Sequence, residues 1–449
     1  IYREVSTLDP GCYLTLGPSG TAKRQRYWRP QFQPAPQLSA ADWADQMRAM
    51  LLETTARHLQ ADVPVAAFLS GGIDSSAILA AMVRASGDPV KAFTIGHPGS
   101  SIDETAAARL IARHLGCEHI VAPLEIESVA DVLPVILRSY DEPFADMAAI
   151  PTWFVSRLAS RDVKVVLCGE GGDELFAGYK RHRNAHLIER HRAKIGAIAP
   201  LTRALSRIPV TGSARANLVR QYAQRFTEFT EVPGGYQQFF AATQISRRTV
   251  REQLFDPQFA AKFEGRDLLA RLEREYFPAD SRTSLSALEQ FLFADLTVNL
   301  PSAMLTRLDR ASMAHSVEAR VPFLSHRMVE WALTIPTDVK LRGRTGKLIL
   351  RNAVAPWLPP SILRLPKQGF QVPMATWLRG RFGEFARAVW NDSGASQLGY
   401  LDGNVVERTF AEHKRGKADH SRILYAITVF ALWWLDHRAR RTLKAADAA

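Results

Sequence analysis

The sequence has 449 residues, a length at which two or three domains are expected. Apolar residues make up 47% and charged residues 23% of the chain, which is ordinary globular usage and excludes collagen-like, disordered and disulfide-scaffold classes. Lysine and arginine outnumber aspartate and glutamate by 57 to 45, so the net charge is +12 and an anionic partner has to be considered.

Three features bear on the compartment. The longest apolar run, residues 423–435, is too short to cross a bilayer and predicts a buried helix. The first residues lack the apolar segment of a secretory signal peptide. The cysteines Cys12, Cys117 and Cys168 are far apart and form no Cys-x-x-Cys pair, which favours a reducing compartment and disfavours a zinc site. We therefore expect a cytoplasmic protein without a membrane partner.

The elements are predicted in chain order. Residues 1–36 read as a strand remnant followed by a proline-rich linker, and residues 39–60 as an amphipathic helix capped by Ser39. Three short apolar runs at 63–69, 90–95 and 163–168 then predict buried strands. Helical patterns separate them, for example at 75–84 and 105–115. Alternation of this kind favours a parallel sheet built from βαβ units. Beyond residue 179 strand signals fade, and the chain reads as largely helical to about residue 441.

The sharpest motif is the run Ser-Gly-Gly-Ile-Asp-Ser-Ser at 70–76, directly after the first buried strand. Two glycines let the backbone approach a ligand, and the free N–H groups at the start of the next helix attract phosphate. The serine hydroxyls add donors, and Asp74 can hold a magnesium ion bound to that phosphate. The pattern is neither a Walker A loop nor a Rossmann motif. The alternative is an ordinary strand-to-helix turn with an Asp or Ser cap.

A second loop, Cys-Gly-Glu-Gly-Gly-Asp-Glu at 168–174, follows another predicted strand. Both loops should meet at the carboxyl edge of the sheet, where open α/β folds bind ligands. A carboxylate there can accept a proton from an incoming amine or coordinate magnesium. The alternative is a solvated acidic turn that caps the following helix.

These motifs carry a family resemblance. The 70–76 loop resembles the pyrophosphate loop of ATP pyrophosphatases, and the whole pattern is similar to the synthetase domain of glutamine-dependent asparagine synthetases. The resemblance covers residues 39–441. The matching stretches are AFTIG at 92–96, ARLIARHLGCEH at 108–119, LCGEGGDELFAGY at 167–179, VEARVPFL at 317–324 and LPKQGFQVP at 365–373.

The resemblance implies an α/β fold: a parallel-sheet ATP pyrophosphatase core, of the adenine nucleotide alpha hydrolase kind, with a largely helical C-terminal region. Residues 1–36 would be the C-terminal remnant of a glutaminase domain plus a linker, in a chain that lacks most of that domain. Residues 37–441 would form the synthetase domain, with its nucleotide core at about 60–180 and its helical region at about 181–441. Residues 442–449 would be a tail. The missing domain would leave the chain dependent on free ammonia.

The resemblance also implies roles for single residues. Asp74, Glu170 and Lys367 would be catalytic, with Glu170 handling the ammonia proton and Lys367 neutralising charge as pyrophosphate leaves. Magnesium would bind Asp74 and Asp173, and the substrate pocket would include Glu170 and Asp173. Cys168 stands where the family often has serine, a change that still leaves its backbone able to meet the nucleotide. The implied ATP-binding residues are Leu69, Ser70, Gly71, Gly72, Asp74, Ser75, Ser76, Ile95, Cys168 and Gly169.

Some polar residues have structural explanations as well. Glu318 and Arg320 are interpreted as a buried ion pair that braces the helical region against the sheet. A structural role is also favoured over a catalytic one for Asp309 and Arg310, with contact between Asp309 and the substrate as the alternative. A group of acidic residues before the second loop could line the rim of the pocket or simply form a turn. The group consists of Asp141, Glu142 and Asp146.

The implied reaction is ATP-dependent amide formation, with ATP and Mg²⁺ as cofactors. The L-aspartate side chain would be adenylated with release of pyrophosphate, and ammonia would then give asparagine and AMP. The same adenylation on another carboxylate remains an alternative, as in surface-polysaccharide amidotransferases or beta-lactam synthetases. An RNA-modifying pyrophosphatase is disfavoured because paired cysteines are absent.

The basic stretch 180–225 contains eleven lysines and arginines but only Tyr222 as an interior aromatic residue. Nucleic-acid binding by stacking is therefore not expected, and a solvated helical face or a contact with an acidic surface is favoured. A homodimer is compatible with the sequence, which does not determine the oligomeric state.

Overall fold

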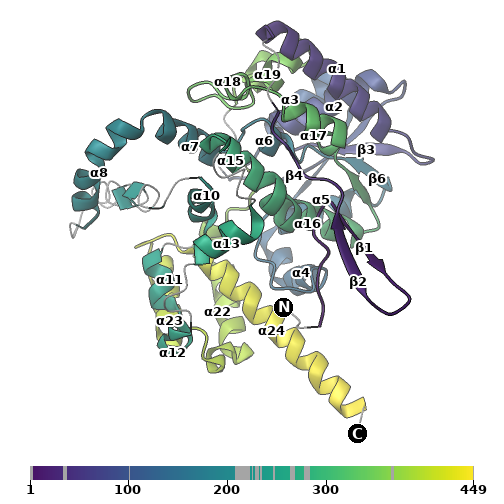
Figure 1. The fold of residues 1–449 in the computed structure, drawn as a ribbon. Helices are drawn as coiled ribbons and strands as arrows, with labels where there is room; N and C mark the ends of the chain where they lie inside the picture. The colour runs from purple at the N-terminus through teal and green to yellow at the C-terminus, as the bar shows by residue number, and fades with distance from the viewer. Residues whose placement is uncertain are drawn as a thin grey trace.

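The computed structural model describes residues 4–33, 38–100, 102–207, 235–245, 248–262, 268–277, 284–365 and 369–447, together with 223, 224, 226, 227 and 232 (Figure 1). Its centre is a five-stranded, fully parallel sheet with the strand order β5-β4-β3-β6-β7. The predicted fold class is therefore confirmed. The strands are β3 (Val65–Phe68), β4 (Lys91–Gly96), β5 (Glu118–Pro123), β6 (Val165–Leu167) and β7 (Glu318–Arg320).

The three predicted strands correspond to β3, β4 and β6. The sequence analysis did not place β5, and β7 corrects the expectation that strands end before residue 179. Both are edge strands, and β7 has only three residues, so neither carries the continuous apolar run of a strand covered on both faces. The strand β7 pairs with β6 through Val165 and Glu318, which brings the distant VEARVPFL segment beside the second glycine loop.

Helices cover both faces of the sheet. One face packs against α1 (Ala40–His58), α2 (Ile73–Ala85) and α3 (Thr105–Leu115). The opposite face packs against α4 (Ile126–Arg138) and α5 (Ala149–Ala159). Alternation along β4 directs Ala92 into the first core and Phe93 and Ile95 into the second. The sheet is thus buried between two cores, as a parallel sheet requires.

The helix α1 confirms the predicted amphipathic helix and its cap. The Ser39 hydroxyl accepts a hydrogen bond from the Asp42 N–H at 3.1 Å, and Asp42 in turn accepts from the Ser39 N–H at 3.3 Å. This reciprocal pair satisfies N–H groups that would otherwise lack partners at the helix start. Ahead of it, β1 (Cys12–Leu16) and β2 (Ala22–Arg26) form an exposed antiparallel hairpin that projects from the body in Figure 1.

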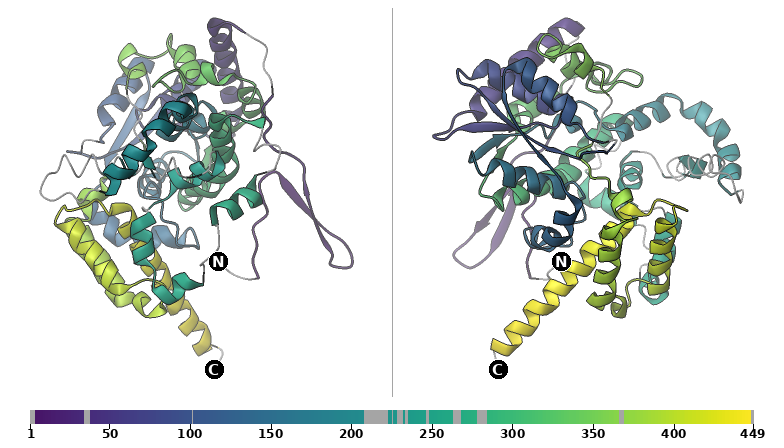
Figure 2. Two further views of the ribbon diagram at one scale, coloured as in Figure 1. Left: turned by 60° about the vertical axis from the view of Figure 1, so that its left-hand side comes forward. Right: turned by 180° about the vertical axis from the view of Figure 1, so that it is seen from behind.

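Helices beyond the second loop form two groups. One group surrounds a buried aromatic cluster that includes Tyr236, Phe239, Phe277, Phe291 and Phe293. A nearly continuous helix passes through this group as α15, a π-helix η1, and α16, and Figure 2 shows it running beside the sheet. In chain order, the helices from the second loop up to β7 are α6 (Gly172–Leu175), α7 (Lys180–Arg190), α8 (Arg192–Arg207), α10 (Tyr236–Thr243), α11 (Arg248–Leu254), α12 (Pro257–Ala261), α13 (Leu268–Tyr276), α15 (Ala287–Ala294), η1 (Asp295–Leu305) and α16 (Thr306–Met313). Of these, α11 and α12 pack with the C-terminal helices and not with the aromatic cluster.

The last part of the chain returns to the sheet. Near α1 lie short helices that complete the first core, and the C-terminal helices complete the second. They are η2 (Pro322–Leu324), α17 (His326–Ala332), α18 (Thr337–Lys340), α19 (Leu348–Val354), α20 (Pro360–Leu363), α21 (Met374–Trp377), α22 (Arg381–Ser393), η3 (Ala395–Leu398), α23 (Gly403–Lys414) and α24 (Ser421–Asp447).

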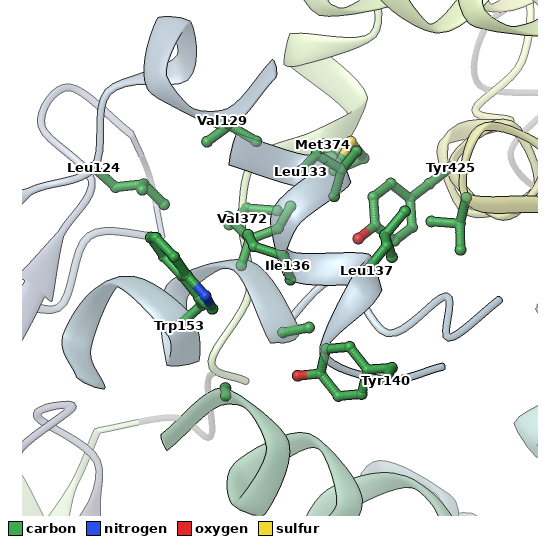
Figure 3. Packing of buried hydrophobic residues seen from close by; sticks show 14 of the residues in the cluster. Leu124, Val129, Leu133, Ile136, Leu137, Tyr140, Trp153, Val372, Met374 and Tyr425 are labelled. Atoms are coloured by element: carbon green, nitrogen blue, oxygen red, sulfur yellow. The ribbon is translucent and has the colours of Figure 1, made fainter. Parts of the chain in front are cut away.

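The apolar run at 423–435 lies in α24, where Leu424, Tyr425 and Val429 are buried, so the predicted buried helix is confirmed. Figure 3 shows Leu133 and Leu137 of α4 between Trp153 of α5 and Tyr425 of α24. Among the described residues, no helix combines the length and the apolar character needed to cross a membrane.

Candidate active site

The first glycine loop joins β3 to α2. Its shape is held by its own hydroxyls: Ser70 Oγ lies 3.1 Å from Ser75 Oγ, and Ser76 Oγ donates to the Gly72 carbonyl at 2.6 Å. The helix α2 begins at Ile73 with no side-chain cap on Gly72. Its first N–H groups therefore face the end of the sheet without a side-chain cap, the arrangement that suits a phosphate group.

The second glycine loop follows β6 and lies against the first. The strands β3 and β6 are paired with Ala67 opposite Leu167, so the two loops leave the sheet side by side. A Cβ on Gly169 would come within 2.7 Å of the Ser75 nitrogen, and one on Gly172 within 2.6 Å of Asp74 Oδ1. Only glycine permits this approach, so the Gly-rich sequence of the second loop is what lets it reach Asp74.

A buried cation joins the two loops. The ammonium group of Lys347 contacts Asp74 and lies 2.6 Å from Asp173 Oδ1, and the lysine is only 2% exposed. Its backbone has φ +54°, a left-handed conformation that is costly for lysine. A hydrogen bond of 2.8 Å from its N–H to the Phe176 carbonyl holds it there. The structure thus brings the two predicted acidic residues together around one positive charge.

Sequence reasoning missed Lys347. It lies some 270 positions after Asp74, in the segment Arg-Thr-Gly-Lys-Leu, immediately before α19. Its sequence neighbourhood carries no signal that distinguishes it from a surface lysine. The predicted cation, Lys367, lies outside the described residues, so its role stays a prediction.

Glu170 belongs to a second charge cluster. Arg307 of α16 places Nη2 3.5 Å from Glu170 Oε1 and Nη1 2.9 Å from Asp146 Oδ2. Burial opposes the charge of Arg307, but Asp146 and Glu170 outweigh it and raise its pKa above the ordinary value. The Tyr140 hydroxyl donates to the Arg307 carbonyl at 3.1 Å and so supports the helix behind it. Glu170 is therefore tethered beside the first cluster by a permanent positive charge.

The acidic rim residues are separated by the structure. Asp146 is bonded to Arg307, whereas Asp141 is exposed and faces Arg310 at 3.9 Å. Arg310 of α16 therefore forms an exposed ion pair with Asp141.

The Glu318–Arg320 pair exists at 2.7 Å, but the Glu318 side chain is 57% exposed, so the expected buried pair is wrong. Strand β7 lies at the sheet edge, where Glu318 faces solvent. Arg320 also donates to the carbonyls of His58 and Gln60, both at 2.8 Å, and fastens the end of α1 to this edge.

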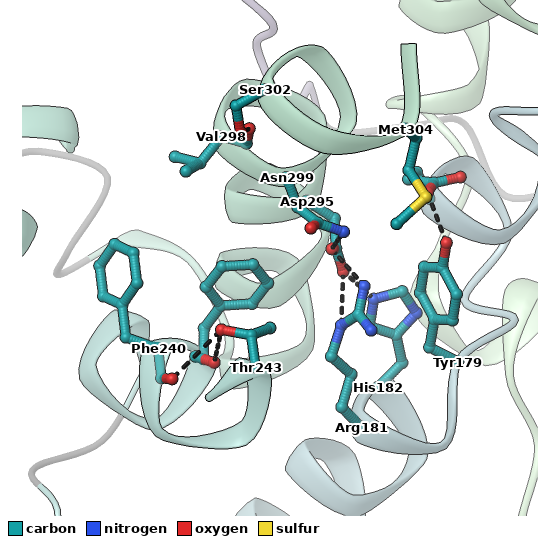
Figure 4. A network of polar contacts seen from close by, with 12 residues as sticks. Tyr179, Arg181, His182, Phe240, Thr243, Asp295, Val298, Asn299, Ser302 and Met304 are labelled. Carbon is teal, nitrogen blue, oxygen red and sulfur yellow. Dashed lines mark hydrogen bonds and ion pairs between the residues drawn. The ribbon is translucent and has the colours of Figure 1, made fainter. Parts of the chain in front are cut away.

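A buried polar network lies behind the second loop (Figure 4). Asp295 is fully buried and contacts Arg181, with His182 Nε2 at 2.6 Å and Asn299 Nδ2 at 3.0 Å. It stands at the first residue of the π-helix η1, a rare form that is often found at functional sites. The network joins α7 to η1 next to the second loop.

Glu174 extends this network toward the loop. It accepts a hydrogen bond of 2.6 Å from the Tyr179 hydroxyl. Burial, reinforced by the charges of Asp173 and Asp295, raises the pKa of Glu174 to about 7. Its carboxyl group therefore changes charge near neutral pH immediately beside Asp173.

The apolar predicted residues lie at the strand ends. Leu69 is buried, and its N–H donates to the Phe93 carbonyl at 2.9 Å. Ile95 is buried in β4, and Cys168 is buried with its N–H donating to the Arg320 carbonyl at 2.9 Å. Burial raises the pKa of the Cys168 thiol well above its ordinary value, so the sulfur stays neutral.

This geometry is that of an α/β protein with two glycine loops at the carboxyl edge of a parallel sheet and two carboxylates gathered around a lysine. The sequence model of the asparagine synthase family matches residues 46–435. The chain belongs to that family, which confirms the resemblance seen in the motifs.

Individual relatives agree with this assignment. A putative glutamine-hydrolyzing asparagine synthetase of Mycobacterium tuberculosis is 34% identical over 439 residues, which cover 96% of this chain and 64% of the relative. The glutamine-hydrolyzing asparagine synthetase 1 of Bacillus subtilis is 28% identical over 430 residues, which cover 96% of this chain and 65% of the relative. The amidase chyE of Penicillium rubens is 25% identical over 464 residues, which cover 95% of this chain and 67% of the relative. The chain thus spans about 64% of the length of the first of these relatives.

Proposed function

We propose that this chain catalyses ATP-dependent amide formation, adenylating the side-chain carboxylate of L-aspartate and then transferring the acyl group to ammonia. The single observation that carries the proposal is the meeting of Asp74, Asp173 and Lys347 at the mouth of two glycine loops. Such a cluster suits a triphosphate: it offers a cation for the departing pyrophosphate and carboxylates for a metal. Family membership supports the same chemistry.

Magnesium fits the residues present. Asp74 and Asp173 direct carboxylate oxygens at one common cation, Lys347, so both already point at a shared position. Magnesium is typically held by one or two carboxylates together with substrate phosphates and waters. These two aspartates would hold the ion, which would supply charge neutralisation for the pyrophosphate when bound. The lack of a Cβ at Gly172 leaves Asp74 Oδ1 the space that this arrangement needs.

The residues of the chain carry the first step. The N–H groups at the start of α2 and the hydroxyls of the 70–76 loop bind the phosphates. An oxygen of the substrate carboxylate forms a bond to the α-phosphorus while the bond to the β-phosphate bridging oxygen breaks. Lys347 stabilises the negative charge that gathers on the departing pyrophosphate. We propose the same role for Lys367.

The second step needs a proton acceptor near the acyl-adenylate. Ammonia adds to the activated carbonyl carbon, the carbon–oxygen bond to AMP breaks, and one proton of the nitrogen is released. Glu170 accepts that proton, and Arg307 keeps its carboxylate oriented at 3.5 Å. Because Arg307 is also fixed by Asp146, the orientation of Glu170 does not depend on the substrate.

Pyrophosphate release tests the proposal. The protein is incubated with Mg-ATP and ammonium, with or without L-aspartate, and pyrophosphate and asparagine are both measured. We expect release that requires aspartate and that falls by at least about a hundredfold in Asp74→Asn. The control is Asp42→Asn on α1, which removes one carboxylate away from both loops. Release without aspartate dependence, or unchanged release in Asp74→Asn, would refute the proposed function.

The glycine loops bind the phosphates and do not select the carboxylate substrate that is adenylated. If pyrophosphate release requires another carboxylate, the adenylation stands and the acceptor is different, as in polysaccharide amidotransferases or beta-lactam synthetases. The fungal relative named an amidase shows that related sequences carry different names. A panel of ω-carboxylates in the same assay distinguishes these outcomes.

We further propose the division of the chain that the motifs indicate, with residues 1–36 as the end of a glutaminase domain and 37–441 as the synthetase domain. The exposed β1–β2 hairpin supports it, because its strands pair only with each other among the described residues. Removing residues 1–33 should leave ammonia-dependent pyrophosphate release intact. Loss of folding in that variant would contradict the division.

A further inference from the structure

A groove of about 370 Å³ lies between α3 and β5. Its volume is within the range of small-molecule sites. None of the proposed catalytic residues lines it. The lining residues are Arg109, Ala112, Arg113, Cys117, His119 and Val121.

The groove has a strong positive charge. Arg109 and Arg113 are one turn apart on α3 and both line it. In the part of the chain that the structure describes, neither forms an ion pair with a carboxylate. Two like charges at this spacing repel each other, so an anion between them would remove an unfavourable interaction. Arginine is also the side chain best suited to bind phosphate oxygens in pairs.

A third basic side chain, His119, lines the groove beside the two arginines. The hydroxyl of Thr94 donates its proton to the Leu69 carbonyl at 2.6 Å, so its oxygen accepts from His119 Nε2 at 2.8 Å. This assigns the neutral tautomer and leaves Nδ1 to take up a proton. Burial and the charge of Arg109 lower the pKa of His119, and a dianion in the groove would oppose the second effect.

The rest of the groove carries no opposing charge. Burial raises the pKa of the Cys117 thiol to about 11, so it remains neutral. Ala112 and Val121 form an apolar part of the wall. The nearest acidic residue on the strand, Glu118, points to the other face and lies 3.5 Å from Lys91. The groove thus combines three basic side chains with a small apolar surface.

We propose that this groove binds a small phosphate dianion, with Arg109 and Arg113 on its oxygens and protonated His119 beside them. Ala112 and Val121 leave room for a short organic group, so a phosphate monoester fits as well as inorganic phosphate. The lining residues of the groove differ from the residues that the proposed amide synthesis uses.

The test compares the wild type with Arg109→Gln/Arg113→Gln. The control, Arg161→Gln/Lys164→Gln, removes two positive charges from exposed positions before β6. Binding of inorganic phosphate and of glycerol 3-phosphate is measured by calorimetry at constant ionic strength. We expect the groove variant to bind about tenfold more weakly or worse, and the control to bind like the wild type. Tighter binding of glycerol 3-phosphate than of phosphate would identify an ester as the ligand class.

The imidazole of His119 provides a local readout. Its NMR signal, assigned by its loss in His119→Gln, should titrate at higher pH when phosphate is present, and this increase should disappear in the groove variant. If the double substitution unfolds the protein, Arg113→Gln alone should still weaken binding about threefold. Unchanged affinity in the groove variant, or a His119 signal insensitive to phosphate, would overturn the proposal.

Discussion

Replacing Lys347 by methionine tests the centre of the site most directly. At 2.6 Å, a pair of unit charges in an effective dielectric of about 20 attracts by about 6 kcal/mol. Desolvation of the buried ammonium offsets part of this gain. Removing one partner of such a pair typically costs about 3–5 kcal/mol, because the other charge is left buried. We expect Lys347→Met to lose that much free energy of unfolding and to lose pyrophosphate release almost completely.

Denaturant unfolding measures the first effect and the pyrophosphate assay the second. The control is Lys164→Met, an exposed lysine before β6, which should change the free energy of unfolding by less than about 0.5 kcal/mol. The triple variant Lys347→Met/Asp74→Asn/Asp173→Asn removes the charges together and should recover most of the stability but none of the activity. A stable and active Lys347→Met protein would refute the reasoning.

Three further predictions concern the loops and the network behind them. Gly172→Ala places a Cβ against the Asp74 carboxylate and should abolish ATP binding, which calorimetry measures. The control is Gly87→Ala, whose Cβ meets no atom within 4 Å and which should bind ATP normally. Equal ATP binding by both variants would contradict the close approach of the two loops. Arg307→Gln should lower kcat about tenfold or more with little change in the KM for ATP, whereas Arg310→Gln, on the same helix but exposed, should not; a fall confined to KM would argue against a positioning role. The folded protein binds the proton of Glu174 more tightly than the unfolded chain, so this group's contribution to stability is full below about pH 4.5 and is lost as pH rises through about 7. Unfolding at pH 5 and pH 8 should therefore differ less in Glu174→Gln than in the wild type, and an identical difference would show that another group titrates.

Much of the site could be predicted because its parts are local in sequence. Each glycine loop follows a buried strand and precedes a helix, so strand, turn and helix are read from one short window. Parallel pairing then requires that two such loops meet at one edge of the sheet. The closeness of Asp74 and Asp173 follows from that rule.

The partners of these carboxylates could not be predicted in the same way. Lys347 and Arg307 reach the loops from segments more than a hundred positions away, and no local pattern distinguishes them from surface cations. The expectation that the Glu318–Arg320 pair is buried was wrong for the same reason, since the exposure of Glu318 depends on the place of its strand at the edge of the sheet. Burial of Asp295 likewise depends on how η1 packs against α7.

The sequence by itself determined the class of fold, the two loops and the family, because hydrophobic periodicity, glycine positions and motif order are properties of short segments. Only the tertiary structure decided which cation neutralises the carboxylates, which arginine orients Glu170, and that Arg109, Arg113 and His119 share a groove. These pairings depend on long-range packing, where the free energy of burying a charge selects a partner from anywhere in the chain.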